Sequence, residues 1–207
     1  MPEFSTDTGV IYYEIVETPS LQNMPGQADK PMLVLLHNFM STGRGAWGPL
    51  LEGLAREFRV ILPDLPGHGR SIGRPPGYNH TVIAHQLAAL FETIGAVDAH
   101  LAGCSSGGMI AQLLVHHDLM APASLALVST THSVEPARNG AVPAMIPAQF
   151  QANARWRQAT ANLHDPHRYD AYFEAVLLPG FRKLRGGDAI DLPLGSLADW
   201  SIPACII

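Results

Sequence analysis

The stretch Leu101-Ala102-Gly103-Cys104-Ser105-Ser106-Gly107-Gly108-Met109-Ile110 decides the fold. An apolar run ends at Gly103 and an apolar-periodic segment follows Gly108, which predicts a strand, a sharp turn and a helix. Gly-x-Ser-x-Gly at such a turn holds Ser105 in a strained backbone and lifts its hydroxyl above the sheet edge, while the glycines let strand and helix approach closely. The pattern alone also fits an ordinary Gly/Ser loop, so its meaning depends on the segments around it.

Short apolar runs bounded by turn residues lie on both sides of this turn, and they indicate strands buried on both faces of a parallel sheet. These runs are Met32–Leu36, Val60–Leu62, Ala99–Ala102 and Leu125–Val128. Apolar residues at helical spacing predict helices over Trp47–Phe58, Ile83–Ile94 and Met109–Leu114. Alternating strands and helices predict an α/β fold with a doubly wound, mostly parallel sheet. Val10–Val16 adds a strand or one half of a hairpin.

Ligands of doubly wound sheets bind at the carboxyl ends of the strands. Four loops of this chain follow such ends, and we expect them to converge on one site. The loops are His37–Gly45, Asp64–Ser71, Gly103–Gly107 and Ser129–Ser133.

The sequence pattern changes after Ser133, because residues 135–200 contain no further buried-strand run. Helical spacing is clearest at Tyr169, Tyr172, Phe173, Val176 and Leu177, and looser over Met145–Trp156. Another apolar run begins at Ile202. We therefore expect the N-terminal part of the core over residues 1–133, a helical lid over 134–200 and the start of a further core strand over 201–207.

The composition limits the classes of function. The net charge is −5 with no basic run, so no nucleic-acid partner is expected. No apolar run reaches the roughly 20 residues that cross a bilayer, and the N-terminus lacks a signal-peptide pattern, so no membrane partner is expected. Cys104 and Cys205 lie far apart, which supports neither a disulfide nor a zinc site and fits a reducing, cytoplasmic compartment. The oligomeric state stays open.

Three motifs stand in a fixed order: Leu35-Leu36-His37-Asn38-Phe39, then Pro63-Asp64-Leu65-Pro66-Gly67-His68-Gly69-Arg70-Ser71, then Gly103-Cys104-Ser105-Ser106-Gly107-Gly108. Together they resemble the α/β-hydrolase superfamily, in its lid-bearing branch of small esterases, lactonases and carbon–carbon bond hydrolases. The second motif, Asp-x-x-Gly-His-Gly-x-Ser, is a specific one. The match is close over residues 10–130, while the lid matches in position and character. The resemblance implies the α/β-hydrolase fold with a helical lid insertion.

The resemblance also implies catalytic roles. Ser105 would be the nucleophile, and the backbone N–H groups of Phe39 and Ser106 would form the oxyanion hole. The family usually has glycine where this chain has Asn38, and asparagine tolerates a left-handed backbone better than most residues do. In the family order Ser, Asp, His, the acid follows the next strand and the histidine follows the last one. Neither partner is present in the chain, so the resemblance implies an N-terminal portion whose C-terminal strands and helices are missing.

Cys104 is an alternative nucleophile, because a thiolate is more nucleophilic than a hydroxyl. Its position does not suit that role, since Ala102 and Ser106 stand where the flanking glycines should be. We expect His68, in the Gly-His-Gly loop, to support the architecture. We expect His37 to orient the loop beside it, with proton transfer as the alternative.

His132 follows the fourth predicted strand, and we expect it to line the pocket. In the alternative, it is a substitute base with Glu135 as its acid. His164 and His167 flank Asp165-Pro166, where a solvated turn is preferred over a metal site. The predicted substrate-binding residues are His37, Asn38, Cys104 and His132.

The sequence therefore predicts a serine hydrolase that acts on an ester, a lactone or a related carbonyl substrate through an acyl-enzyme, in its complete form. The substrate is a small molecule, and no metal or organic cofactor is required. The serine argues against epoxide hydrolase and haloalkane dehalogenase chemistry, which uses aspartate at this turn. Two alternatives remain: an inactive truncated fragment, and a non-catalytic member of the fold that binds a small molecule.

Overall fold

The computed structural model describes residues 2–17, 30–73, 79–135, 152–182 and 186–207. Within these residues, a seven-stranded sheet has the order β1-β2-β4-β3-β5-β6-β7. Its strands are β1 (Glu3–Thr6), β2 (Gly9–Val16), β3 (Met32–Leu36), β4 (Arg59–Pro63), β5 (His100–Cys104), β6 (Leu125–Val128) and β7 (Ala204–Ile206). β1 and β2 form an antiparallel hairpin that pairs antiparallel with β4, and the other neighbours pair parallel. The predicted mostly parallel sheet is therefore confirmed.

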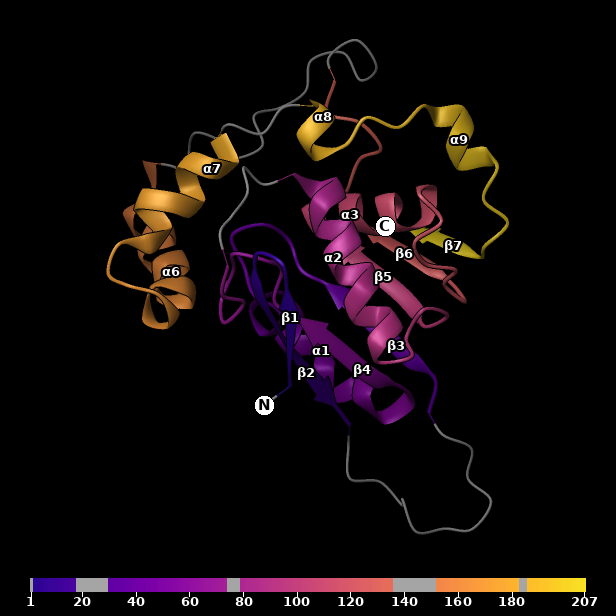
Figure 1. Cartoon of the computed structure of the whole chain (residues 1–207), viewed down its shortest axis with the longest axis horizontal. Helices are drawn as coiled ribbons and strands as arrows, with labels where there is room; N and C mark the ends of the chain where they lie inside the picture. Colours follow the sequence, from indigo (N-terminus) through magenta and orange to yellow (C-terminus); the bar gives the residue numbers. More distant parts are fainter. Residues whose placement is uncertain (1, 18–29, 74–78, 136–151, 183–185) are drawn as a thin grey trace.

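Helices cover both faces of the sheet (Figure 1). They are α1 (Gly43–Glu57) on one face, and α2 (His80–Thr93) and α3 (Ser106–His116) on the other. Successive side chains of a strand point to opposite faces. Accordingly, Leu33 and Leu35 of β3 pack in the cluster with α1, while Val34 and Leu36 pack in the cluster with α2 and α3. The continuous apolar run of β3 is thus buried on both sides.

Two helices begin about one turn earlier than their apolar spacing predicts, because capping side chains set their starts. Thr42 Oγ1 accepts a hydrogen bond from the N–H of Gly45 at 3.0 Å at the start of α1. Asn79 Oδ1 accepts from the N–H of Val82 at 3.1 Å at the start of α2. Both bonds satisfy N–H groups that lack partners inside the helix.

The segment after β6 is mainly helical, with residues 136–151 outside the described part of the chain. Its elements are α6 (Ala154–His164), the 3₁₀ turn η1 (Asp165–His167), the π-helical turn η2 (Phe173–Leu177), α7 (Leu178–Arg182), α8 (Gly186–Ala189) and α9 (Leu194–Ala198). Figure 1 shows α6 and α7 together at the left, and α8 contacts α2. Most of the predicted Met145–Trp156 helix lies outside the described residues. Of the predicted aromatic stripe, Tyr172 and Phe173 are buried but Tyr169 is 56% exposed.

Asp64 and Ser71 hold together the Gly-His-Gly loop, defined here as residues 64–71. The carboxylate of Asp64 accepts hydrogen bonds from the N–H of Gly43 at 2.8 Å and of Arg70 at 3.0 Å. The first of these places a negative charge at the N-terminus of α1, where the helix dipole favours it. Ser71 Oγ donates to the carbonyl of Asp64 at 2.6 Å and accepts from the N–H of Tyr12 at 2.9 Å. The spacing of Asp64 and Ser71 in the motif thus has a structural reason in this chain.

We expect Asp64→Ala to lower the free energy of unfolding by about 2–4 kcal/mol, because the buried N–H of Gly43 and the partly buried N–H of Arg70 lose their charged acceptor. Urea unfolding monitored by circular dichroism measures this. Glu92→Gln removes an exposed carboxylate of α2 and should change the stability by less than about 0.5 kcal/mol. An Asp64→Ala loss no larger than that of the control would contradict the structural role of Asp64.

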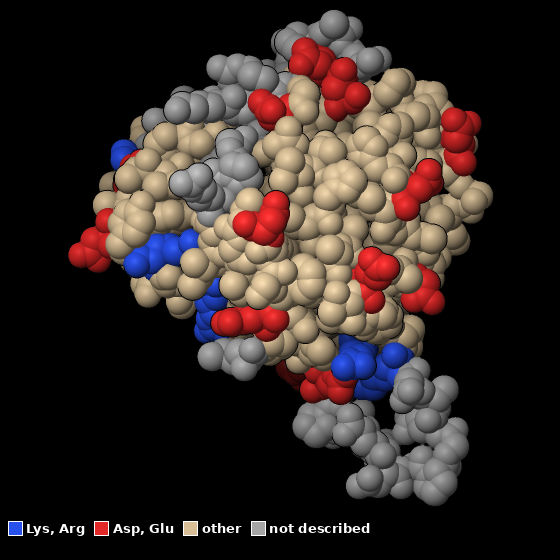
Figure 2. All heavy atoms as spheres, viewed as in Figure 1, with Lys and Arg blue, Asp and Glu red and all other residues tan. Residues whose placement is uncertain are grey.

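Two further features of the molecule are the distribution of its charged side chains and the hydropathy of its helices. On the face drawn in Figure 2, acidic side chains are dispersed and basic ones form only small groups. None of the helices in the described segments has the length and apolar character that crossing a membrane requires.

Candidate active site

Ser105 lies between β5 and α3 in a left-handed backbone, with φ 52° and ψ −117°. Its N–H donates to the carbonyl of Val128 on β6 at 2.9 Å. Its own carbonyl accepts from the N–H of Met109 at 3.0 Å and from Thr130 Oγ1 at 2.7 Å. The predicted strand, sharp turn and helix are therefore confirmed. These bonds fix an uncommon conformation that a serine adopts only when its surroundings enforce it.

The glycines around Ser105 are required by close contacts. A Cβ atom on Gly103 would lie 2.4 Å from the carbonyl oxygen of Gly107. A Cβ on Gly107 would lie 2.4 Å from the carbonyl oxygen of Leu36 and 2.5 Å from that of His37. The turn thus brings β3, β5 and α3 into backbone contact at this point.

Cys104 ends β5 and is half-buried. Burial raises the pKa of its thiol, so the reactive thiolate is scarce at neutral pH. The structure therefore gives no support to Cys104 as a nucleophile. Its predicted contact with a substrate stays a prediction.

The β3–α1 loop (residues 37–42) runs beside the N-terminus of α3. The N–H of Phe39 donates to Ser106 Oγ at 2.5 Å, so this loop and the residue after Ser105 are in direct contact. The left-handed residue of the loop is Met40, with φ 68°, and not Asn38. Asn38 instead donates through Nδ2 to the carbonyl of Phe39 at 3.1 Å.

His37 is fully buried, and both of its ring nitrogens are engaged. Nδ1 lies 2.8 Å from the carbonyl of Asn38, and Nε2 accepts from the N–H of Leu65 at 2.8 Å. These partners assign the neutral tautomer with the proton on Nδ1. Burial also lowers the pKa of His37. These bonds join two loops, as expected of a residue that orients the loop beside it, and the predicted substrate contact of His37 stays a prediction.

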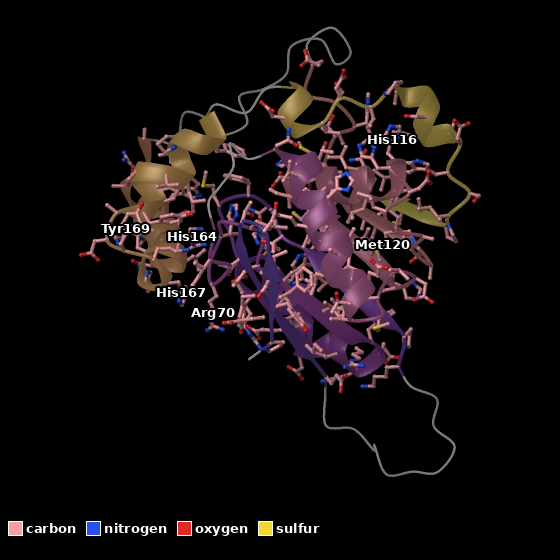
Figure 3. The ribbon with its side chains drawn as sticks, viewed as in Figure 1. Arg70, His116, Met120, His164, His167 and Tyr169 are labelled. Atoms are coloured by element: carbon pink, nitrogen blue, oxygen red, sulfur yellow. The ribbon has the colours of Figure 1, made fainter. Side chains whose placement is uncertain are left out.

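His68 and His164 pack face to edge, with ring centroids 5.5 Å apart, and both are fully buried. His68 also lies edge-on to Phe39 at 4.5 Å, and burial lowers the pKa of His68 well below its ordinary value. The expectation that His164 lies in a solvated turn is wrong, whereas His167 is exposed. Figure 3 shows His164 on the inner side of α6 and Tyr169 on the outer side.

Three side chains, four residues apart in sequence, bind backbone groups of the Gly-His-Gly loop; we call them the clasp. His164 Nδ1 accepts from the N–H of Gly69 at 2.9 Å, Tyr172 Oη donates to the carbonyl of Gly67 at 2.8 Å, and Arg168 donates to the carbonyl of Ser71. Sequence reasoning missed the clasp. Its spacing was visible in the sequence, but its backbone partners lie about one hundred residues away.

The β3–α1 loop shares a hydrophobic cluster with the helical segment. Phe39 and Met40 pack with buried residues of η2 and α7, and the rings of Phe39 and Phe181 are 4.2 Å apart. The other buried members of the cluster are Tyr172, Phe173, Leu177, Leu178 and Ala189. The side chains beside the Phe39 N–H are therefore packed against residues 172–189.

His132 lies in the loop after β6 and is half-buried. Its Nδ1 is 2.8 Å from the carbonyl of Leu192, and Ser133 Oγ donates to Asp191 Oδ1 at 2.8 Å. The Nδ1 bond leaves Nε2 of the neutral ring as an acceptor. A role of His132 in the pocket stays a prediction. In the described segments, no group of three or more histidine, cysteine, aspartate or glutamate side chains is placed to hold a metal ion.

Comparisons with known proteins agree with this geometry. A model of the alpha/beta hydrolase family matches residues 33–204. The chain is 39% identical over 88 residues to the magnesium-chelatase 30 kDa subunit of Rhodobacter capsulatus. This alignment covers 42% of this chain and 30% of that protein. It is 36% identical over 106 residues to a pimeloyl-[acyl-carrier protein] methyl ester esterase of Nitrosospira multiformis, covering 50% of this chain and 40% of the esterase.

Among solved structures, a hydrolase from Pseudomonas aeruginosa PA01 superposes with a TM-score of 0.69 at 21% identity, over 99% of this chain and 78% of that one. This likeness shows the fold. The matches to the two curated relatives span 30% and 40% of their lengths. Because the two relatives are a chelatase subunit and an esterase, these matches leave the substrate open.

Proposed function

The chain belongs to the alpha/beta hydrolase family, and on that premise we propose that Ser105 is the nucleophile of a hydrolase that cleaves an ester, a lactone or a related carbonyl substrate. The observation that carries the proposal is the backbone of Ser105, at φ 52° and ψ −117°, locked between β5 and α3. The likeness to a methyl ester esterase supports a carbonyl substrate. A strained turn of this kind is kept where a side chain must be presented.

In the proposed reaction, Ser105 Oγ forms a bond to the carbonyl carbon and its proton passes to a histidine. Collapse of the tetrahedral intermediate breaks the bond to the leaving group, which takes that proton. Water then attacks the acyl-enzyme and releases the acid. The N–H groups of Phe39 and Ser106 would stabilise the oxyanion, and the contact of Phe39 N–H with Ser106 supports their proximity.

We propose that the general base is not one of the histidines of this chain. All ten histidines lie in described segments, and none hydrogen bonds to Ser105 Oγ there. His37 is committed to two backbone groups, and His164 to Gly69. We therefore propose that the base and its acid come from residues outside the printed sequence, as the family order of Ser, Asp and His implies.

We also propose that residues 134–200 form a lid over Ser105. The packing of Phe39 and Met40 against η2 and α7 supports this, because it places helices of this segment beside the β3–α1 loop. The lid would determine which substrates reach Ser105.

A fluorophosphonate probe tests the proposal in the full-length protein. We expect one label, located on Ser105 by peptide mass spectrometry, and no labelling of Ser105→Ala. Ser129→Ala is the matched control, because Ser129 also has a left-handed backbone after a strand but is exposed and belongs to no proposed catalytic group. An unlabelled wild-type protein would favour a non-catalytic binding protein, and label retained in Ser105→Ala would place the nucleophile elsewhere.

A further inference from the structure

We propose that the side chain of Ser106 is itself a catalytic group, whose hydroxyl donates a hydrogen bond to the oxyanion. This inference rests on the proposed function of Ser105, because an oxyanion forms only if Ser105 attacks a carbonyl. The family pattern assigns Ser106 through its backbone N–H alone. The hydroxyl would be a further donor, placed between the N–H of Phe39 and the oxyanion, and the geometry of the β3–α1 loop points to it.

The first observation is the contact between Ser106 Oγ and the N–H of Phe39 at 2.5 Å. The same N–H is the second expected donor of the oxyanion hole. An oxyanion bound directly to it would need to lie about 2.7–3.1 Å away, within the region that Ser106 Oγ now occupies. The hydroxyl oxygen of Ser106 therefore occupies the position from which an oxyanion would accept the N–H of Phe39.

The second observation concerns the proton of this hydroxyl. Ser106 is 1% exposed, so water has little access to it. Its oxygen accepts from Phe39, but within the described segments its O–H has no acceptor. A buried donor without an acceptor is unfavourable. An oxyanion on the carbon attacked by the neighbouring Ser105 would supply the acceptor.

These two observations define a chain of donors. The N–H of Phe39 donates to Ser106 Oγ, and the O–H of Ser106 donates to the oxyanion. Hydrogen bonds in such a chain polarise one another, and a bond to an ionised acceptor is stronger than a neutral one. Phe39 would then act on the oxyanion through Ser106, in addition to the direct bond from the N–H of Ser106.

A rival role for Ser106 Oγ predicts the opposite effect of Ser106→Ala on the reaction rate. If Ser106 Oγ merely filled the hole, a substrate would have to displace it, and its removal would free the N–H of Phe39. Ser106→Ala would then react faster than the wild-type protein. The effect of this substitution therefore separates a donor from a blocking group.

The experiment compares the second-order rate of fluorophosphonate labelling, and kcat and KM for p-nitrophenyl acetate, in full-length wild-type protein and Ser106→Ala. We expect labelling and kcat to fall by about 10²-fold with little change in KM, as for loss of an oxyanion donor. Ser41→Ala is the control. It removes another buried hydroxyl, near the same loop, which is weakly bound to the carbonyl of Thr42 at 3.4 Å.

A second pair of variants guards against a folding defect. Ser106→Thr and Ser106→Val have nearly the same shape, so any steric cost at this buried position is shared, and only threonine keeps the hydroxyl. We expect the threonine variant to react about 10²-fold faster than the valine variant. Equal rates in this pair, or an alanine variant at least as fast as wild type, would overturn the inference.

Labelling of the wild-type protein separates this inference from the function on which it rests. If Ser105 of the wild-type protein is not labelled, the proposed function fails and the donor role of the Ser106 hydroxyl fails with it. If Ser105 is labelled but the hydroxyl of Ser106 has no effect, only that donor role is rejected.

Discussion

Gly107→Ala should lower the free energy of unfolding by about 3 kcal/mol or more, and it should abolish fluorophosphonate labelling of Ser105 in whatever fraction remains folded. The added Cβ would lie 2.4 Å from the carbonyl oxygen of Leu36 and 2.5 Å from that of His37. Both obstacles are backbone atoms of the sheet and its following loop, so no side chain can rotate away. The expected relief is a shift of α3 away from β3, which moves Ser105 and Ser106 relative to Phe39.

Gly53→Ala is the matched control for this substitution. Gly53 lies within α1, and a Cβ there would meet no atom within 4 Å. Alanine is favoured over glycine inside a helix, so this variant should gain up to about 1 kcal/mol. Urea unfolding of both variants measures the difference. A small loss in Gly107→Ala, with labelling intact, would contradict the close approach of α3 to β3.

Acidification from pH 6.5 to pH 4 should destabilise the protein strongly through buried histidines. Burial lowers the pKa of His80 and of His164 to about 4. The unfolded chain binds protons at these rings below about pH 6.5, whereas the native protein does not until about pH 4. Stability is therefore complete above pH 6.5 and falls as the pH drops toward 4. Each ring contributes roughly 3 kcal/mol to this loss.

His164→Asn isolates the contribution of the clasp. Asparagine can offer Oδ1 to the N–H of Gly69 in place of Nδ1, but it does not titrate. The loss of stability between pH 7 and pH 4.5, measured by urea unfolding, should shrink in this variant by about 2–3 kcal/mol. An unchanged pH dependence in His164→Asn would show that His164 is protonated in the native protein.

The groups around His164 act in the same direction as burial. His37, Arg168 and His167 each disfavour a positive charge on the ring of His164 and so lower its pKa. The backbone of Met40 acts in the opposite direction and raises that pKa. The pKa of His37 and of His68 is lowered by burial as well. The loss of stability at acidic pH therefore arises from the buried histidines His37, His68 and His164 together. Of these three, His164 belongs to α6.

The sequence predicted those features whose causes are local. Leu101–Ile110 contains its own strand, turn and helix, and Met32–Leu36 is apolar throughout because both faces of β3 are covered. β1 was missed, because its four residues carry no clear alternation and gain their structure from pairing with β2. The π-helical turn at Phe173–Leu177 was read as part of an ordinary helix, since the two have similar apolar spacing.

The errors at the candidate site concern contacts between distant segments. The left-handed residue of the β3–α1 loop is Met40, whose side chain packs against η2 and α7, and sequence reasoning did not single it out. His164 was expected in solvent because it precedes Asp165-Pro166, yet its partner is Gly69. The hydroxyl of Ser106 drew no attention because only its backbone N–H has a role in the family pattern. Such pairings depend on tertiary packing, which a single sequence does not specify.

The clasp and the shared cluster bear on how this protein can be redesigned. Residues 152–182 cannot be exchanged independently of the core. Phe39 and Met40 pack in the same hydrophobic cluster as these residues. In addition, His164 and Tyr172 bind the Gly-His-Gly loop. A graft from a relative would also disturb the packing beside the N–H of Phe39. Recombination that respects the architecture would therefore transfer residues 37–42 and 64–71 together with the helices that pack on them.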